Sequence, residues 1–93
     1  MIQDFQCKET EKVWRGNISR RFPANIQRIA LRKLTQISAA ESVSDLRVPP
    51  GNRLELLKGV RAGQHSIRIN DQWRICFIWK NIHAYKVEII DYH

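Results

Sequence analysis

The chain has 93 residues, with 16 Lys and Arg against nine Asp and Glu and a formal net charge of +7. This length excludes two self-sufficient halves, so we expect a single domain over residues 1–93. A hydrophobic share of 43% argues against disorder, and the short apolar runs argue against a signal peptide or a membrane span. Cys7 and Cys76 lie in no metal-like spacing, so a cytoplasmic location fits best.

The basic surplus has two interpretations, attraction to polyanions or simple solubility, and net charge alone does not separate them. Residues 47–74 contain six basic residues against two acidic ones, and this concentration favours polyanion binding. The six are Arg47, Arg53, Lys58, Arg61, Arg68 and Arg74.

The N-terminal part of the chain is predicted to be helical after a short opening segment, residues 1–5, that is compatible with an edge strand. Residues 8–15 lack Gly and Pro and are followed by Gly16, which predicts a short first helix. Pro23 stands where a second helix begins, and apolar residues then recur at steps of three and four as far as residue 39 or 40.

The segment VPPGN at 48–52 stops any helix and marks the passage to a strand-forming half. Strands are predicted at 53–57, 64–69, 73–79 and 85–90, with hairpin turns at Asn70-Asp71 and at 81–84. The expected fold class is α+β, with two N-terminal helices packed on one face of a mostly antiparallel sheet of four to five strands.

Side-chain alternation divides the strand residues between two faces of the sheet. The face that the second helix should cover carries four apolar residues, Trp73, Ile75, Phe77 and Trp79. Arg68 and Arg74 fall on the other face, with the exact register left open. Guanidinium groups there need not be buried, and their planar fork of donors suits phosphate. For any one arginine a pair with Glu88 or Asp91 is as good an interpretation, but the acids are too few to pair all of them.

The chain ends in Asp91, Tyr92 and His93, directly after an apolar strand. A terminal histidine is often incidental, yet pairing of 85–90 with 73–79 would bring these residues near Arg74. A histidine, a tyrosine and a carboxylate beside cations can transfer protons at phosphorus. No nucleophile motif, phosphate loop or metal signature is present, so we expect neither cofactor nor metal. The catalytic chemistry that remains is metal-free acid–base and electrostatic catalysis, which suits RNA cleavage by the RNA's own 2′-hydroxyl.

A close resemblance to the HigB-type toxins of the RelE/ParE superfamily is carried by two segments, LRVPPGNRLELLKGVRAGQHSIRINDQWRICFIW and the terminal VEIIDYH. These toxins are the killer proteins of bacterial toxin–antitoxin modules, and the resemblance spans essentially the whole chain. It implies a RelE-like fold similar to that of a small microbial ribonuclease. It also implies a ribosome-dependent mRNA interferase, which enters the ribosomal A site and cleaves the codon there.

The resemblance further implies two sets of functional residues. The catalytic set is Arg74, His93, Tyr92, Asp91 and Lys58. The RNA-binding set is Arg53, Arg61 and Arg68. Arg74 would stabilise the pentavalent phosphate, His93 and Tyr92 would transfer protons or stack on a base, and Asp91 would orient them. Some members carry a histidine three residues before the lysine of LKG, whereas this chain has Glu55, which could act as a base but also repels phosphate.

The partners implied by the resemblance are a helix-turn-helix antitoxin of the HigA type and the 30S A site with its mRNA and 16S rRNA. The antitoxin would bind away from the active face, and operator DNA would be reached only through it, with no membrane partner. Two other functions stay open: a non-catalytic basic domain that binds rRNA or DNA, and a ParE-like inhibitor of DNA gyrase. The terminal Asp-Tyr-His favours the ribonuclease, because neither alternative needs a proton-transfer group.

Overall fold

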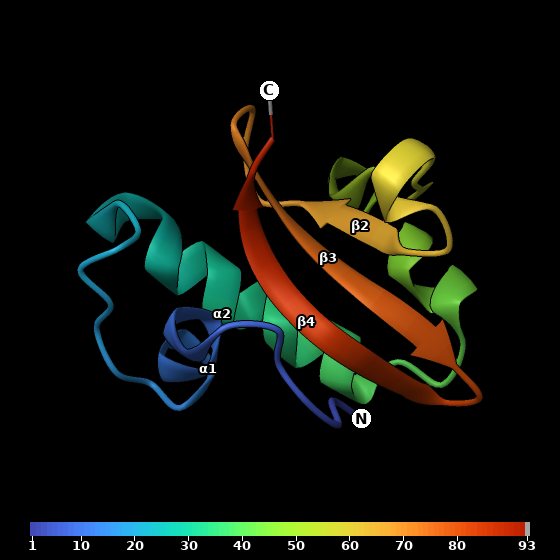
Figure 1. Ribbon diagram of the computed structural model, residues 1–93, viewed down its shortest axis with the longest axis horizontal. Helices are drawn as coiled ribbons and strands as arrows, with labels where there is room; N and C mark the ends of the chain where they lie inside the picture. The colour runs from blue at the N-terminus through green and yellow to red at the C-terminus, as the bar shows by residue number, and fades with distance from the viewer. Residues whose placement is uncertain (93) are drawn as a thin grey trace.

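The computed structural model describes residues 1–92 and consists of two helices followed by an antiparallel sheet (Figure 1). Helix α1 spans Lys8–Trp14, and its first turn is capped by the Cys7 sulfur, which accepts from the backbone N–H of Thr10. Helix α2 spans Ala24–Ala39 directly after Pro23, whose fixed φ suits a helix start. Both helices begin and end within a residue of their predicted limits.

The sheet has four strands in the order β1-β2-β3-β4, and every neighbouring pair is antiparallel. The strands are β1 (Glu55–Leu56), β2 (His65–Arg68), β3 (Trp73–Lys80) and β4 (His83–Asp91). The predicted α+β fold with two helices and an antiparallel sheet is therefore confirmed.

Strands β2 and β3 lie within a residue of their predicted limits, whereas β1 and β4 each begin two residues from the predicted start. Strand β1 has two residues rather than five, because Arg53 before it adopts left-handed backbone with φ of 46° and a 3₁₀ turn follows it. Strand β4 begins at His83, two residues early, because the hairpin turn consists of Asn81 and Ile82 alone. Three short 3₁₀ helices, η1 (Val43–Arg47), η2 (Pro50–Asn52) and η3 (Gly59–Arg61), lie at the β2 side of the sheet (Figure 1).

Strand β4 contains an irregularity opposite β3. The pairing register shifts between Cys76 and Ile78, and Lys86 on β4 has a positive φ of 51°. Its backbone N–H donates to the Asp4 carboxylate. The N-terminal segment runs along this outer edge of β4 and forms two isolated parallel bridges with it, so the predicted edge strand is present as bridges.

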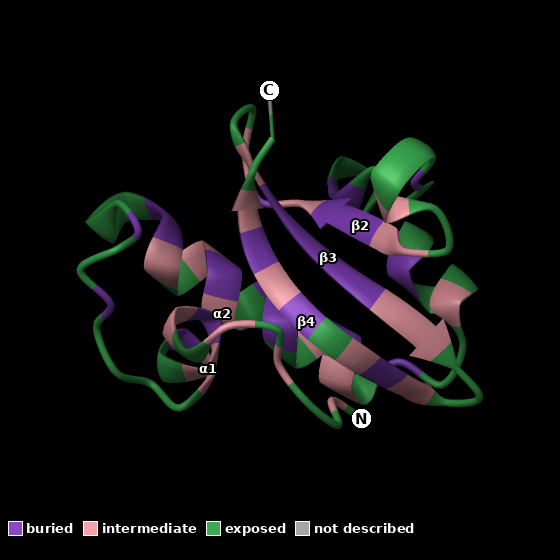
Figure 2. Cartoon of the chain, viewed as in Figure 1, coloured by how far each residue is buried: buried purple, intermediate pink, exposed green. Residues whose placement is uncertain are grey.

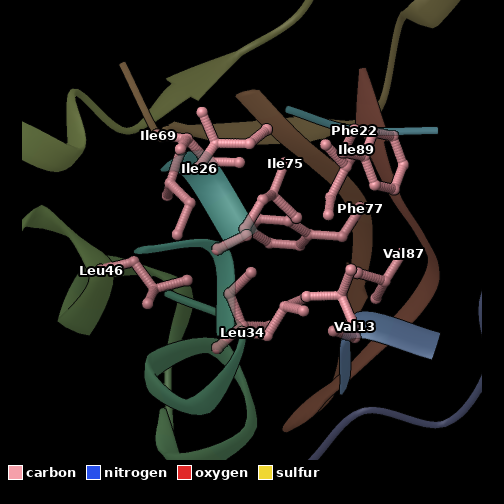
Figure 3. Packing of buried hydrophobic residues seen from close by; sticks show 14 of the residues in the cluster. Val13, Phe22, Ile26, Leu34, Leu46, Ile69, Ile75, Phe77, Val87 and Ile89 are labelled. Atoms are coloured by element: carbon pink, nitrogen blue, oxygen red, sulfur yellow. The ribbon is translucent and has the colours of Figure 1, made fainter. Parts of the chain in front are cut away.

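The core lies between α2 and the sheet, with α1 packed at its β4 side (Figure 3). Phe77 and Ile75 of β3 are fully buried against α2 residues such as Ile26 and Leu34. Trp73 and Trp79 pack at the margins of this cluster, as their alternation with the arginine face predicts. The buried stretch of β3 contrasts with the exposed turns at its ends (Figure 2). Within residues 1–92, no helix is long and apolar enough to cross a membrane.

Candidate active site

Arg74 lies on the sheet face opposite the helices, where alternation places it, and it is the cross-strand partner of Arg68. The expectation that it need not be buried is wrong, because Arg74 is only 8% exposed. The covering groups are the backbone at Arg53 and the aromatic ring of Tyr92. Arg74 is therefore buried by the loop that contains Arg53 and by the C-terminal end of the chain, and not by the helices.

Two residues hold the guanidinium of Arg74 through three hydrogen bonds. The Nε–H donates to the Ser66 hydroxyl at 2.8 Å, and Nη2 donates to the carbonyl oxygens of Arg53 at 2.7 Å and Ser66 at 3.3 Å. Nη1 donates to no protein group within residues 1–92. A guanidinium carries five N–H donors, so one edge of this cation is fixed by the protein and the other can bind a ligand oxygen.

Tyr92 and Glu55 complete this arrangement around Arg74. The Tyr92 ring lies over the guanidinium, 5.4 Å from Cζ to the ring centroid, which is within cation–π range. The Tyr92 hydroxyl lies 3.4 Å from Glu55 Oε1, a long hydrogen bond, and the same oxygen is 4.0 Å from Arg74 Nη2. Glu55 reaches this position because β1 pairs it with Ser66, which shares the face of Arg74.

A pocket of about 360 Å³ opens beside this group. Its lining residues are Glu55, Leu56, Leu57, Lys58 and Tyr92. Lys58 is exposed at its rim, so a cation and a carboxylate from residues 55–58 and a phenol from the C-terminal end of the chain face one solvent-accessible hollow. Such a hollow can accept a phosphate and groups that exchange protons with it.

Arg61 and Arg68 form ion pairs, so they are less available to bind RNA than predicted. Arg61 Nη1 lies 3.1 Å from Glu88 Oε1, and Arg68 pairs with Asp71. Together with the Arg74–Glu55 pair, each of the three has an acidic partner, so the expectation that the acids are too few is wrong. Asp71 is 98% exposed, and an ion pair so open to water contributes little to stability.

Asp91 is not brought to Arg74. It pairs with Trp73 across the sheet, which puts its side chain on the helix-covered face, and it accepts a hydrogen bond from Gln72 at 3.1 Å. There it lines a separate pocket with Arg21 and Phe22, among other residues. His93 lies outside the described residues.

Two residues of the site were missed or only partly recognised from sequence. Ser66 was missed, although alternation along β2 puts it on the same face as Arg68 and so on the side of Arg74 across the hairpin. Glu55 was noted only as a departure from the family pattern, although it contacts both Arg74 and Tyr92. Within residues 1–92, no group of three His, Cys, Asp or Glu side chains lies close enough to hold a metal ion.

Comparisons with known proteins agree with this architecture. A family model described as the RelE-like toxin of type II toxin-antitoxin system HigB matches residues 3–93. Toxin HigB-1 of Vibrio cholerae serotype O1 is 41% identical over 80 residues, which cover 85% of this chain and 84% of that protein. An uncharacterized protein of Haemophilus influenzae is 41% identical over 66 residues, covering 71% of this chain and 65% of that protein.

Among solved structures, YafQ from Escherichia coli strain BL21(DE3) superposes with a TM-score of 0.60, covering 98% of this chain and 91% of that chain. Its sequence identity is 13%, so this likeness concerns the fold alone. The family model and the similarity to the Vibrio toxin, in contrast, show the family as well as the fold. The chain belongs to the HigB-like toxin family, the RelE-like toxins of type II toxin–antitoxin systems.

Proposed function

We propose that this toxin is a ribosome-dependent endoribonuclease that cleaves mRNA in the ribosomal A site. The observation that carries the proposal is the half-satisfied guanidinium of Arg74, held against Ser66 and Arg53 and flanked by Tyr92 and Glu55. A pre-oriented cation with a free donor edge stabilises charge that develops on a phosphate, because no reorganisation is needed at the moment of reaction.

The proposed reaction is attack of the RNA 2′-oxygen on the adjacent phosphorus, with breakage of the bond to the 5′-oxygen. A base takes the 2′-hydroxyl proton and an acid protonates the leaving 5′-oxygen, which leaves a 2′,3′-cyclic phosphate and a 5′-hydroxyl. Glu55 is the base in this scheme, because its carboxylate faces the pocket beside Arg74 and accepts from the Tyr92 hydroxyl. His93 is proposed as the acid from the family resemblance alone.

The other predicted residues take supporting roles. Lys58 at the pocket rim, together with Arg53, Arg61 and Arg68, is proposed to hold the RNA backbone. Two of these arginines are ion-paired with Glu88 and Asp71, so RNA has to displace carboxylates to reach them. This competition weakens binding to free RNA and supports a requirement for the ribosome to align the message. Asp91 is proposed to order the chain end through Gln72, and it has no part in the chemistry.

Membership of the family implies a cognate antitoxin. We propose that it is a helix-turn-helix protein of the HigA type, which reaches operator DNA while the toxin does not touch the DNA itself. The ribosomal partner is proposed to be the 30S A site with its 16S rRNA.

The test is induction of the toxin in growing cells with mapping of new mRNA 5′ ends. We expect protein synthesis to stop and cuts to appear at codons in the A site. Arg74→Ala should lower the cleavage rate by roughly 10²–10³-fold, the usual cost of removing one donor that stabilises a transition state. Glu55→Gln and deletion of His93 should each also relieve the arrest.

Arg15→Ala is the matched control, because Arg15 is an exposed, ion-paired arginine of the helical side. It should arrest growth as the parent protein does. Continued translation with loss of DNA supercoiling would support the gyrase alternative. Arrest without mRNA cuts would support a non-catalytic binder, and full toxicity of Arg74→Ala would remove the proposed site.

A further inference from the structure

A buried polar pair between α2 and the loop before β1 has no role in the chemistry proposed above. Asn52 is fully buried, and its Oδ1 accepts from the Lys33 ammonium of α2. Its Nδ2 donates to the carbonyl oxygen of Leu46 at 3.1 Å and to Gln36 Oε1 at 3.1 Å, with the Val48 carbonyl at 3.4 Å. Every polar atom of this side chain is used, which fixes the orientation of the amide.

Lys33 is an unusual partner for a core position. The residue is 8% exposed, and burial is the main cause that lowers the pKa of its ammonium, followed by repulsion from Arg32 and Arg68. A buried cation is costly unless it is hydrogen-bonded, and Asn52 is its hydrogen-bond acceptor within residues 1–92. The pair therefore ties helix α2 to one point of the loop.

That point lies next to the residue that holds Arg74. Arg53 directly follows Asn52 and adopts left-handed backbone, with φ of 46° and ψ of 55°. Residues with a Cβ rarely adopt this conformation, and it persists only where neighbouring contacts impose it. In this conformation the Arg53 carbonyl accepts from Arg74 Nη2 at 2.7 Å. The direction of the carbonyl depends on the backbone that Asn52 anchors.

We propose that Asn52, fixed by Lys33 of α2, is a positioning residue that aims the Arg53 carbonyl at Arg74 and so sets the rotation of its guanidinium. The pair acts on the catalytic residue through the backbone without contacting RNA. With Nη2 and Nε held, the Nη1 edge faces the ligand. Without the anchor, the guanidinium can turn about its long axis, and the donor edge is presented only part of the time. The catalytic consequence rests on the proposed function, while the positioning itself does not.

The positioning is tested by nuclear magnetic resonance of the Arg74 side chain in purified protein. In the parent protein the Nη signals of Arg74 should be resolved, because hydrogen bonds to Ser66 and Arg53 slow rotation of the guanidinium. In Asn52→Ala and in Lys33→Met these signals should broaden or merge. Signals that stay resolved in both variants would overturn the proposal, whatever the protein does to RNA.

The catalytic consequence is tested by single-turnover cleavage of mRNA on programmed ribosomes. Asn52→Ala should reduce the maximal rate by roughly 10- to 100-fold with little change in the ribosome concentration at half-maximal rate, as misplacement of a catalytic group does. Thr10→Val is the matched control, because Thr10 is equally buried and its hydroxyl accepts from the Ile89 N–H, away from Arg74. An equal rate loss in folded Thr10→Val would make the Asn52 effect a matter of stability alone and overturn the proposal.

A second pair of variants keeps the test decisive if Asn52→Ala does not fold. Arg53→Gly and Arg53→Val both remove the guanidinium, but only glycine tolerates left-handed backbone. The valine variant should cleave at least ten times more slowly than the glycine variant and should show the merged Arg74 signals. Equal cleavage rates and equal Arg74 signals in the two variants would overturn the proposal that the backbone at Arg53 positions Arg74. If the parent protein cleaves nothing, the proposed function fails, and the resonance measurement still decides the positioning.

Discussion

At the scale of single residues, the site depends on how many donors of one guanidinium the protein occupies. Three hydrogen bonds from Nε and Nη2 fix Arg74, and the aromatic ring of Tyr92 covers it. A buried cation is costly to desolvate, so these contacts both stabilise the fold and orient the charge. Cys76 lies beside it on the same face, fully buried among Arg61, Glu88, Arg74 and Glu55, and burial raises the pKa of its thiol to about 11.

The shifted pKa of Cys76 predicts how stability changes in alkaline solution. The folded thiol stays neutral up to about pH 11, while the unfolded thiol ionises near 9.0, so the unfolded state binds fewer protons between these values. The free energy of unfolding should therefore fall as pH rises through this window, by roughly 2 kcal/mol from this group. Chemical denaturation at several pH values should give a steeper decline for the parent protein than for Cys76→Ala. Parallel curves would contradict the assignment.

At the scale of elements, β4 has to curve around the core and still meet the N-terminal segment along its outer edge. The left-handed residue Lys86 makes this bend, and its N–H is taken up by Asp4. The bridges at Ile2 and Phe5 cover an edge of β4 that would otherwise expose unpaired backbone groups. Strand β4 is thereby held on both sides around Ala84 and Val87.

Lys86→Gly should increase the free energy of unfolding by about 0.5–1 kcal/mol. Left-handed backbone costs an ordinary residue about 1–2 kcal/mol, and the larger entropy of unfolded glycine cancels part of that gain. Lys80→Gly is the matched control, because Lys80 is exposed in β3 and outside the positive-φ residues, so this change should destabilise. Urea denaturation of both variants measures the difference. A loss in Lys86→Gly equal to that in Lys80→Gly would show that the bend carries no strain.

At the scale of the whole molecule, the larger basic surplus is not on the candidate active face. Residues 8–33, which form α1, the following loop and most of α2, contain eight basic residues against two acidic ones. Residues 47–74, whose excess of basic side chains favoured polyanion binding, carry a smaller surplus. Many of these basic side chains form ion pairs. Arg28 and Arg32 are exposed and form no ion pair within residues 1–92. If the proposed function holds, we expect general attraction to RNA and cleavage of RNA to involve different parts of the surface.

Double charge reversal, Arg28→Glu with Arg32→Glu, should weaken binding to an unstructured RNA. The slope of log affinity against log salt concentration should become shallower by about 1.4, because each lost phosphate contact on single strands removes about 0.7. Arg74→Ala should alter this slope by less than half as much while lowering the cleavage rate by roughly 10²–10³-fold. Fluorescence anisotropy over a salt series measures both. An unchanged slope in the double variant would show that the helical face does not attract RNA.

The fold and the faces of the sheet were predictable because they follow from local periodicity and turn chemistry. Alternation along β3 was enough to predict that Ile75 and Phe77 lie on its core face. The burial of Arg74 was not predictable, because it depends on the left-handed backbone of Arg53 and on packing of Tyr92, both set by tertiary contacts. Asn52 gave no signal at all, since asparagine in a Pro-Gly segment is ordinarily a turn residue.

The acidic partners of the arginines were missed for a related reason. The pairing of Arg61 with Glu88 spans β3, and counting acids along the chain does not reveal which strands meet. The position of Glu55 depends on a two-residue strand whose register only the structure gives. Residues whose roles depend on one strand's own alternation were found, and those that depend on contacts between elements were not.

The register shift between β3 and β4 determines which end residue meets the guanidinium. Pairs before the bend are offset by one position from those after it, since Ile78 faces Tyr85 while Cys76 faces Glu88. The additional residue inverts the parity of the final stretch and leaves Tyr92, rather than its neighbour Asp91, on the side of Arg74. A regular ladder over the same residues, without this shift, would put the carboxylate rather than the phenol on the side of the cation. A single-residue deletion between Glu88 and Asp91 would have that same effect, whereas removing the additional residue at the shift itself would leave Tyr92 in place.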